Sequence, residues 1–210
     1  MSHARFDGVV FDMNGTLIDD VAFHIDAWRA LGAQLGLPVS DASLEAFNGL
    51  KNEDIIALLV GPGVSADDAA RFAEQKEALY RQRYRPHLRL IPGAAALLER
   101  LASAGIGVAI ASSAPPENRT MVLDELRLHP FIDVVVPAET LPGKPRPDIF
   151  LAAARLLGVA PARCLAFEDA VSGVRAAVEL GACPAVLHGQ AVRARRGGGL
   201  DGVAAAGPAR

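Results

Sequence analysis

The sequence predicts an α/β fold, in which a parallel sheet is covered by helices and a helical segment is inserted after the first strand. Short, continuously apolar runs, which are typical of buried parallel strands, alternate with amphipathic stretches typical of helices. One long segment, from about residue 20 to 86, keeps helical periodicity and contains no convincing strand. The chain of 210 residues is long enough for one such domain with a small insert.

The predicted strands are apolar runs that are too short for helices and too uniformly apolar for a half-exposed sheet. They are Phe6–Phe11, Ile106–Ala111, Val134–Val136, Cys164–Phe167 and Ala185–Leu187. Because helical patterns separate successive strands, the strands should run parallel. We therefore expect a Rossmann-like sheet with helices on both faces.

The helices predicted between these strands have recognisable ends. Pro92-Gly93 precedes one helical pattern, and Pro147 stands at the expected first helical position of another. A third pattern, Ala170–Leu180, stops at Gly181, which is a favourable C-terminal cap. These signals place a helix before the second, fourth and fifth strands.

The inserted segment predicts a helical cap. Apolar residues recur at helical spacing near its start, and a second long helical pattern follows; these are Phe23, Ala27, Leu31 and Leu35, and then Ala69–Tyr84. We expect a core domain made of residues 1–19 and 87–210 and a cap made of residues 20–86. Ligands of open α/β sheets bind beyond the carboxyl ends of the strands, so the cap should lie above that edge as a lid.

Composition excludes several functions. Hydrophobic residues make up 51% and the net charge is −3, so the chain is expected to be globular and to lack the basic surface that nucleic acid requires. No apolar run approaches the roughly 18 residues of a membrane helix, and no secretory signal or disulfide framework is apparent. We expect a cytoplasmic protein. Residues 191–210 carry excess positive charge and are expected to form a poorly ordered tail.

Polar residues follow the first four predicted strands of the core. The first strand leads into Asp12 and the turn that follows it, the second into Ser112-Ser113, the third into a loop with Lys144, and the fourth into Glu168-Asp169. Parallel strands bring these groups to one edge. Carboxylates hold Mg²⁺, while hydroxyl, ammonium and backbone N–H groups bind phosphate oxygens. The set therefore suits a phosphoryl group.

These four stretches resemble, in order, the motifs of the haloacid dehalogenase superfamily of phosphohydrolases, and the resemblance extends to about Leu187. Within the superfamily the chain is most similar to β-phosphoglucomutase and related sugar-phosphate phosphatases with a helical cap. The supporting stretches are residues 23–28, 144–150 and 167–173, which read FHIDAW, KPRPDIF and FEDAVSG. The resemblance implies a Mg²⁺-dependent phosphatase that acts on a small phosphorylated metabolite through an aspartyl phosphate.

The resemblance also implies a role for each matching residue. Asp12 would be the nucleophile, and Lys144 would neutralise the negative charge of Asp12 and the phosphate. The metal ligands would be Asp12, the backbone carbonyl of Asn14, Asp169 and, directly or through water, Glu168. The residues expected around the phosphate and the rest of the substrate are Ser112, Ser113, Thr16, His24 and Lys51.

Asn14 is a departure from the family pattern, which places a second aspartate at this position. That aspartate protonates the departing alkoxide and then activates the water that hydrolyses the aspartyl phosphate. The carboxamide of Asn14 cannot transfer a proton in this way, although its backbone carbonyl can still bind the metal. A positioned acid or base contributes about 10²–10⁴-fold to a rate, so the expected loss is large.

Three hypotheses follow from Asn14. The substrates have good leaving groups, as acyl and aryl phosphates do; or Asp20 or His24 replaces the proton carrier; or the protein binds a phosphorylated ligand with Mg²⁺ without turning it over. For Asp20 a helix N-cap is the favoured interpretation, and for His24 a cap residue that packs or contacts substrate.

The sequence bears on two other activities. A β-phosphoglucomutase-like phosphotransferase remains an alternative, although it needs proton transfer in both directions. In the related cap loop Lys51 stands where an arginine is usual. A phosphonatase-like route needs an imine-forming lysine in the cap, and nothing in the sequence marks Lys51 or Lys76 as desolvated. The sequence leaves open whether the chain is a monomer or a homodimer.

Overall fold

The computed structural model describes residues 6–47 and 51–186 and contains a five-stranded parallel sheet. The strands are β1 (Gly8–Phe11), β2 (Gly107–Ile110), β3 (Val134–Val135), β4 (Cys164–Glu168) and β5 (Cys183–Val186), in the spatial order β3-β2-β1-β4-β5. Each overlaps a predicted strand. β5 starts earlier than predicted because Cys183 already pairs with Leu165, and the predicted end at Leu187 lies outside the described residues.

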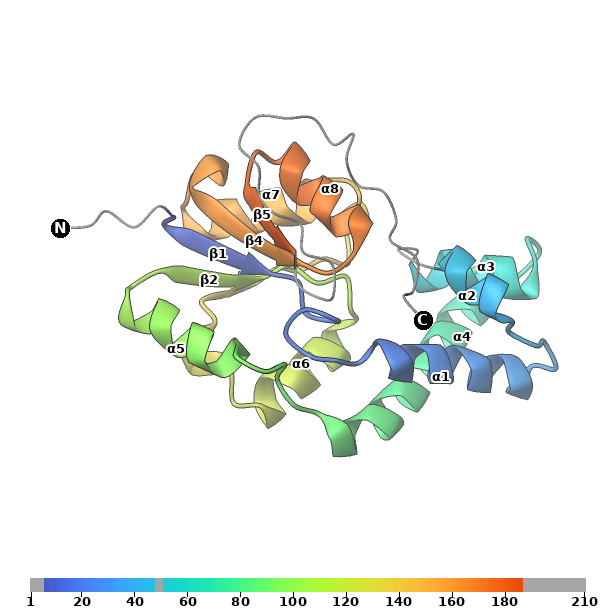
Figure 1. Ribbon diagram of the computed structural model, residues 1–210. Coiled ribbons are helices and arrows are strands. Elements are labelled where there is room, and N and C mark those ends of the chain that lie inside the picture. Colours follow the sequence, from blue (N-terminus) through green and yellow to red (C-terminus); the bar gives the residue numbers. More distant parts are fainter. Residues whose placement is uncertain (1–5, 48–50, 187–210) are drawn as a thin grey trace, which may run out of the picture.

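Helices cover both faces of the sheet (Figure 1). One face carries α5 (Ala94–Ser103) and α6 (Pro116–Glu125), and the other carries α7 (Asp148–Leu157) and α8 (Val171–Glu179). Both faces of β1 are therefore buried: Val9 packs with the α5–α6 layer and Val10 with the α7–α8 layer. Short 3₁₀ turns lie at Arg85–His87, His129–Phe131 and Pro161–Arg163. The predicted α/β fold class is confirmed.

The structure corrects one predicted helix end in the core and confirms another. Pro147 is the N-cap of α7 rather than its first helical residue, since its carbonyl accepts the first hydrogen bond, from the Leu151 N–H at 2.9 Å. Gly181 follows α8 at a φ of +82°, a conformation that favours glycine, as the capping signal predicts.

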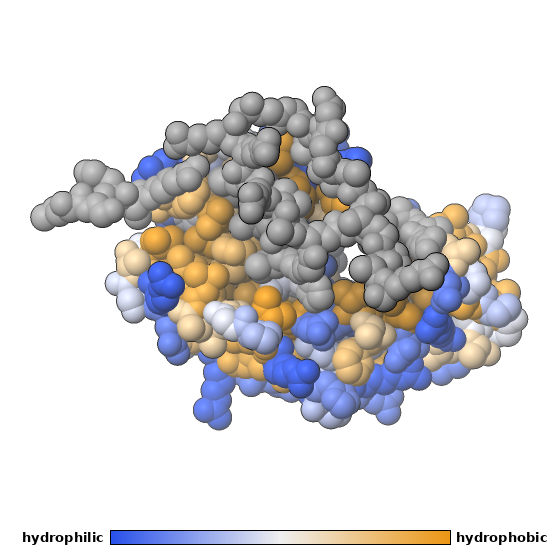
Figure 2. All heavy atoms as spheres, viewed as in Figure 1, coloured by the Kyte–Doolittle hydropathy of each residue, from blue (hydrophilic) through white to orange (hydrophobic). Residues whose placement is uncertain are grey.

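The inserted segment consists of α1 (Val21–Gln34), α2 (Asp41–Phe47), α3 (Asn52–Val60) and α4 (Ala66–Tyr84). These cap helices share a small core of their own, made of Trp28, Leu31, Phe47, Ile55, Ile56 and Ala69. They lie beyond the carboxyl ends of the strands, as Figure 1 shows. Figure 2 shows mainly hydrophilic residues along the lower edge of the molecule, where α6 and the end of α4 lie in Figure 1. The division at residues 19/20 and 86/87 stays a prediction.

No helix in residues 6–47 and 51–186 combines the length and the apolar character needed to cross a membrane. The predicted tail, residues 191–210, lies outside the described part of the chain.

Candidate functional site

The loop after β1 places Asp12 at the centre of the site. The Asp12 N–H donates to the Phe167 carbonyl at 2.9 Å, which continues the pairing between β1 and β4. The chain then turns at Gly15, whose φ is +73°. A Cβ at Gly15 would also lie 2.2 Å from Asp169 Oδ2, so both the conformation and the space require glycine here.

Three carboxylates converge beside this loop. Asp12, Glu168 and Asp169 each offer an oxygen, and these atoms lie within 4.8 Å of one another. Glu168 fits because Gly173 of α8 has no side chain: a Cβ there would lie 1.8 Å from Glu168 Oε1. Carboxylate oxygens are ligands that Mg²⁺ prefers, so the donor set fits that ion.

Lys144 lies between two of these carboxylates. Its Nζ donates to Asp12 Oδ1 at 2.6 Å and also to Glu168. Burial alone would lower the pKa of Lys144, but the two carboxylates outweigh burial and raise it. Burial raises the pKa of Asp12 to about 7, with Glu168 adding to the effect and Lys144 opposing it. Burial and then Glu168 raise the pKa of Asp169 as well, so the site holds excess negative charge that a divalent cation would neutralise.

A cavity of about 210 Å³ is formed by these groups. Its wall includes Asp12, Asn14, Ser112, Ser113, Lys51, Lys144, Glu168 and Asp169. Ser112 Oγ accepts from the Ala114 N–H at 3.1 Å and donates to Asn14 Oδ1 at 3.3 Å. Thr16 is fully buried, does not line the cavity, and donates from Oγ1 to Asp169 Oδ1 at 3.3 Å.

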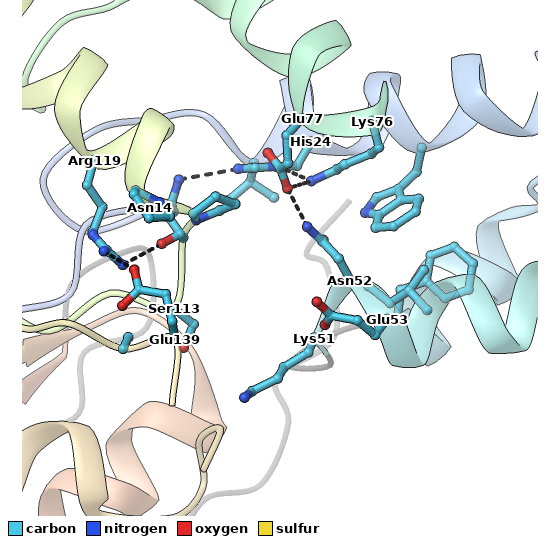
Figure 3. Close-up of a pocket in the computed structure, with 18 of the residues that line it drawn as sticks. Asn14, His24, Lys51, Asn52, Glu53, Lys76, Glu77, Ser113, Arg119 and Glu139 are labelled. Atoms are coloured by element: carbon cyan, nitrogen blue, oxygen red, sulfur yellow. Dashed lines mark hydrogen bonds and ion pairs between the residues drawn. The ribbon is translucent and has the colours of Figure 1, made fainter. Parts of the chain in front are cut away.

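A larger cavity of about 950 Å³ adjoins this one, between the cap and the core (Figure 3). The cap contributes His24, Lys51, Asn52, Lys76 and Glu77, and the core contributes Ser113, Arg119 and Glu139. Lys51 is exposed and its Nζ donates to the Leu141 carbonyl at 3.0 Å, across the boundary between cap and core. The structure therefore brings every predicted site residue except Thr16 to the two cavity walls.

Asn14 and Asp20 form a hydrogen bond that the sequence pattern does not predict. Asn14 Nδ2 donates to Asp20 Oδ2 at 2.5 Å, and the Tyr80 hydroxyl donates to the same oxygen at 2.5 Å. Burial would raise the pKa of Asp20, but hydrogen bonds from His24, Tyr80 and Asn14 hold it below its usual value. Asp20 is the N-cap residue of α1, as predicted, but its side chain makes no capping hydrogen bond and turns into the site instead.

His24 lies between Asn14 of the loop after β1 and Lys76 of the cap helix α4. Its Nε2 is 3.2 Å from Asn14 Nδ2, its Nδ1 is 2.7 Å from Lys76 Nζ, and its ring stacks on Tyr80. Lys76 in turn donates to Glu77 Oε1 at 2.8 Å. Lys76 is only 2% exposed, a desolvation that the sequence does not reveal, and burial lowers its pKa.

Sequence reasoning also missed Tyr80 and Glu77. Lys76 and Tyr80 are four residues apart on α4, a spacing that places both on one face of the helix. That spacing becomes informative only when the face is known to meet the site, since a buried lysine and tyrosine look in the sequence like parts of an ordinary amphipathic helix.

The parallel sheet, the lysine beside a buried aspartate, the acidic pair and the helical cap together define a capped α/β hydrolase. The model of the haloacid dehalogenase-like hydrolases matches residues 6–181, and the chain belongs to this family. The family predicted from the sequence is confirmed, and the protein is an enzyme.

Known proteins resemble most of the chain. A β-phosphoglucomutase of Bacillus subtilis is 33% identical over 80% of this chain and 77% of its own length. Hexitol phosphatase A of Escherichia coli is 34% identical over 84% of this chain and 81% of its own length. The crystal structure of a family IA, variant 3 hydrolase from Entamoeba histolytica has a TM-score of 0.80 at 34% identity, covering 86% of this chain and 83% of that one. These relatives confirm the predicted β-phosphoglucomutase-like subgroup.

Proposed function

We propose that this enzyme is a Mg²⁺-dependent phosphatase that acts on a small phosphorylated metabolite through an aspartyl phosphate at Asp12. The observation that carries the proposal is the contact of Lys144 with Asp12 at 2.6 Å, beside an acidic pair and below a cap-covered cavity. The names of the relatives, a β-phosphoglucomutase and a hexitol phosphatase, support a phosphorylated carbohydrate as the substrate class.

The reaction has two steps. A carboxylate oxygen of Asp12 attacks phosphorus, and the bond from phosphorus to the leaving oxygen breaks with its electron pair on that oxygen. Water then attacks the same phosphorus and releases Asp12 and inorganic phosphate. Lys144 neutralises the negative charge that the two anions bring together, and Ser112 and Ser113 orient the phosphoryl oxygens.

The metal would be held by Asp12, the backbone carbonyl of Asn14, Asp169 and, directly or through water, Glu168. When bound, Mg²⁺ neutralises phosphate charge and orients the phosphoryl group. Thr16 supports the set by donating to Asp169, which fixes that carboxylate.

The test of the proposal is phosphate release with Mg²⁺ from acetyl phosphate, p-nitrophenyl phosphate and a panel of sugar phosphates. We expect repeated turnover, with the highest kcat/KM for the acyl and aryl phosphates. A protein that binds phosphate with Mg²⁺ but releases none from any of these compounds would instead be a binding protein. Conversion of β-glucose 1-phosphate into glucose 6-phosphate would favour the phosphotransferase that the B. subtilis relative suggests.

Removal of Mg²⁺ is expected to stop turnover, and Asp169→Asn is expected to raise the half-saturating Mg²⁺ concentration by at least about 10-fold. The reason is that Asp169 supplies one of the three clustered carboxylate oxygens. Phosphate release measured against Mg²⁺ concentration, after chelation and dialysis, checks this expectation. Glu179→Gln is the control, because Glu179 is an exposed carboxylate on α8. An unchanged Mg²⁺ dependence in Asp169→Asn would rule out this ligand.

We further propose that His24 replaces the missing aspartate as the acid that protonates the leaving group, whereas the base that activates the attacking water has no replacement. Its Nε2 lies 3.2 Å from Asn14 Nδ2, and its ring lines the larger cavity, where a leaving group would stand. Asp20 is fully buried and bonded to Asn14 and Tyr80, so it orients these partners and does not reach the leaving group.

His24→Ala is expected to lower kcat/KM for sugar phosphates by about 10²–10⁴-fold. The expected loss for acetyl phosphate is less than about 10-fold, because acetate leaves without protonation. Phosphate release under kcat/KM conditions checks both values, with His129→Ala as the control at an exposed histidine of the core. Equal losses for both substrate types would contradict a role in protonating the leaving group.

A further inference from the structure

We propose that Asn118 is a positioning residue that holds the cap closed on the core and thereby keeps His24 at the site. Asn118 lies in the first turn of α6, a core helix, and its side chain is fully buried. The inference rests on the proposed function for its catalytic consequence, but the closure itself is independent of that function.

Both polar groups of Asn118 bond across the boundary to the cap helix α4. Its Nδ2 donates to Glu77 Oε2 at 2.7 Å, and its Oδ1 accepts from Arg81 Nη1 at 3.0 Å. Glu77 can only accept and Arg81 can only donate, so the two partners fix which way the amide points. An aspartate at this position would lose the donor, and an alanine would lose both contacts.

Glu77 connects this contact to the catalytic loop. Its other oxygen, Oε1, accepts from Lys76 Nζ at 2.8 Å and from Asn52 Nδ2 at 2.8 Å. Lys76 Nζ also lies 2.7 Å from His24 Nδ1, and His24 Nε2 reaches Asn14. An unbroken series of polar contacts therefore runs from the core helix α6, through the cap, back to the core loop that carries Asp12.

Apart from the contacts of Asn14 and Asp20 inside the site, the other polar contacts described between the core and the cap or its linker are exposed. Lys51 reaches the Leu141 carbonyl from an exposed position, and Arg85, in the linker after α4, pairs with Glu125 where the two side chains are 61% and 37% exposed. Exposed ion pairs contribute little, whereas a buried carboxylate that loses its partner is costly. The buried contacts of Asn118 should therefore contribute most to the closed state among the described polar contacts outside the site.

Asn118→Ala should open the cap, and the single tryptophan of the chain reports it. Trp28 lies in α1, is 5% exposed and lines the cavity between cap and core. A hydrogen bond to a charged group changes an equilibrium by about 10- to 100-fold. We expect Asn118→Ala to lower kcat/KM for sugar phosphates by about that factor and to increase acrylamide quenching of Trp28 by at least about 2-fold. A single cooperative thermal transition should show that the variant remains folded.

Glu125→Gln is the matched control, because Glu125 also lies on α6 but its ion pair with Arg85 is exposed. Both kcat/KM and the quenching of Trp28 should stay unchanged in this variant. The pair Asn118→Asp with Glu77→Gln exchanges carboxylate and amide across the boundary. If the two residues bond directly, the double variant should show less quenching of Trp28 and a higher kcat/KM than the summed effects of the two single substitutions predict.

Quenching in Asn118→Ala that equals that of the unaltered protein would overturn the inference, as would strictly additive effects in the double variant. Absence of turnover in the unaltered protein would refute the proposed function alone, since the quenching of Trp28 does not depend on catalysis.

Discussion

Asp12→Ala is expected to abolish phosphate release, with a loss of at least about 10⁴-fold in kcat. The substitution removes the only group proposed to bond to phosphorus, and it leaves Lys144 beside Glu168 without its second carboxylate. Steady-state phosphate release from acetyl phosphate, which needs no leaving-group protonation, measures the loss without interference from the proton carrier.

Asp19→Ala is the matched control for Asp12→Ala. Asp19 is a neighbouring aspartate of the same loop, but its side chain is exposed. It should retain nearly full activity. An Asp12→Ala variant that kept more than about a hundredth of the activity would contradict the assignment of the nucleophile.

Asn14→Asp together with Asp20→Asn is expected to raise kcat for sugar phosphates by about 10²–10⁴-fold, while Asn14→Asp alone should give a much smaller gain. Asn14 Nδ2 and Asp20 Oδ2 are 2.5 Å apart. The single substitution Asn14→Asp would set two carboxylates at this spacing, and they cannot both remain ionised. Exchanging the two residue types keeps the hydrogen bond and moves the carboxylate to the catalytic loop, where it can activate the water that hydrolyses the aspartyl phosphate.

The measurement is kcat for a sugar phosphate in the two single variants and the double variant. Asp20→Asn alone is the control, since it removes the buried carboxylate without adding one at position 14. A single Asn14→Asp variant as active as the double variant would contradict the account of why Asn14 and Asp20 occur together.

Much of the fold was predictable because its signals are local. Continuous apolar runs such as residues 164–167 can be satisfied only by a strand buried on both faces, and the order of the runs fixes a parallel sheet. The convergence of Asp12, Lys144 and Glu168 followed from the same rule, because all three stand after strands whose carboxyl ends meet.

The cap side of the site was not predictable, because its contacts join residues far apart in the sequence. Asp20 precedes α1, and local sequence favours a helix cap there; its actual partner Tyr80 stands on another helix, 60 residues further along the chain. In the same way Asn118 looks like a surface residue of α6 until Glu77 and Arg81 are seen to enclose it. Local propensity carries no information on such pairs.

The most direct test of the proposed mechanism is a rapid-quench reaction of the unaltered protein with acetyl phosphate and Mg²⁺, followed by peptide mapping. Asn14 cannot activate the hydrolytic water, so the aspartyl phosphate should accumulate. We predict a burst of acetate approaching about one equivalent per chain and a phosphoryl group on the peptide that contains Asp12. Turnover with no phosphoryl group on that peptide, and at the same rate in Asp12→Ala, would contradict the mechanism.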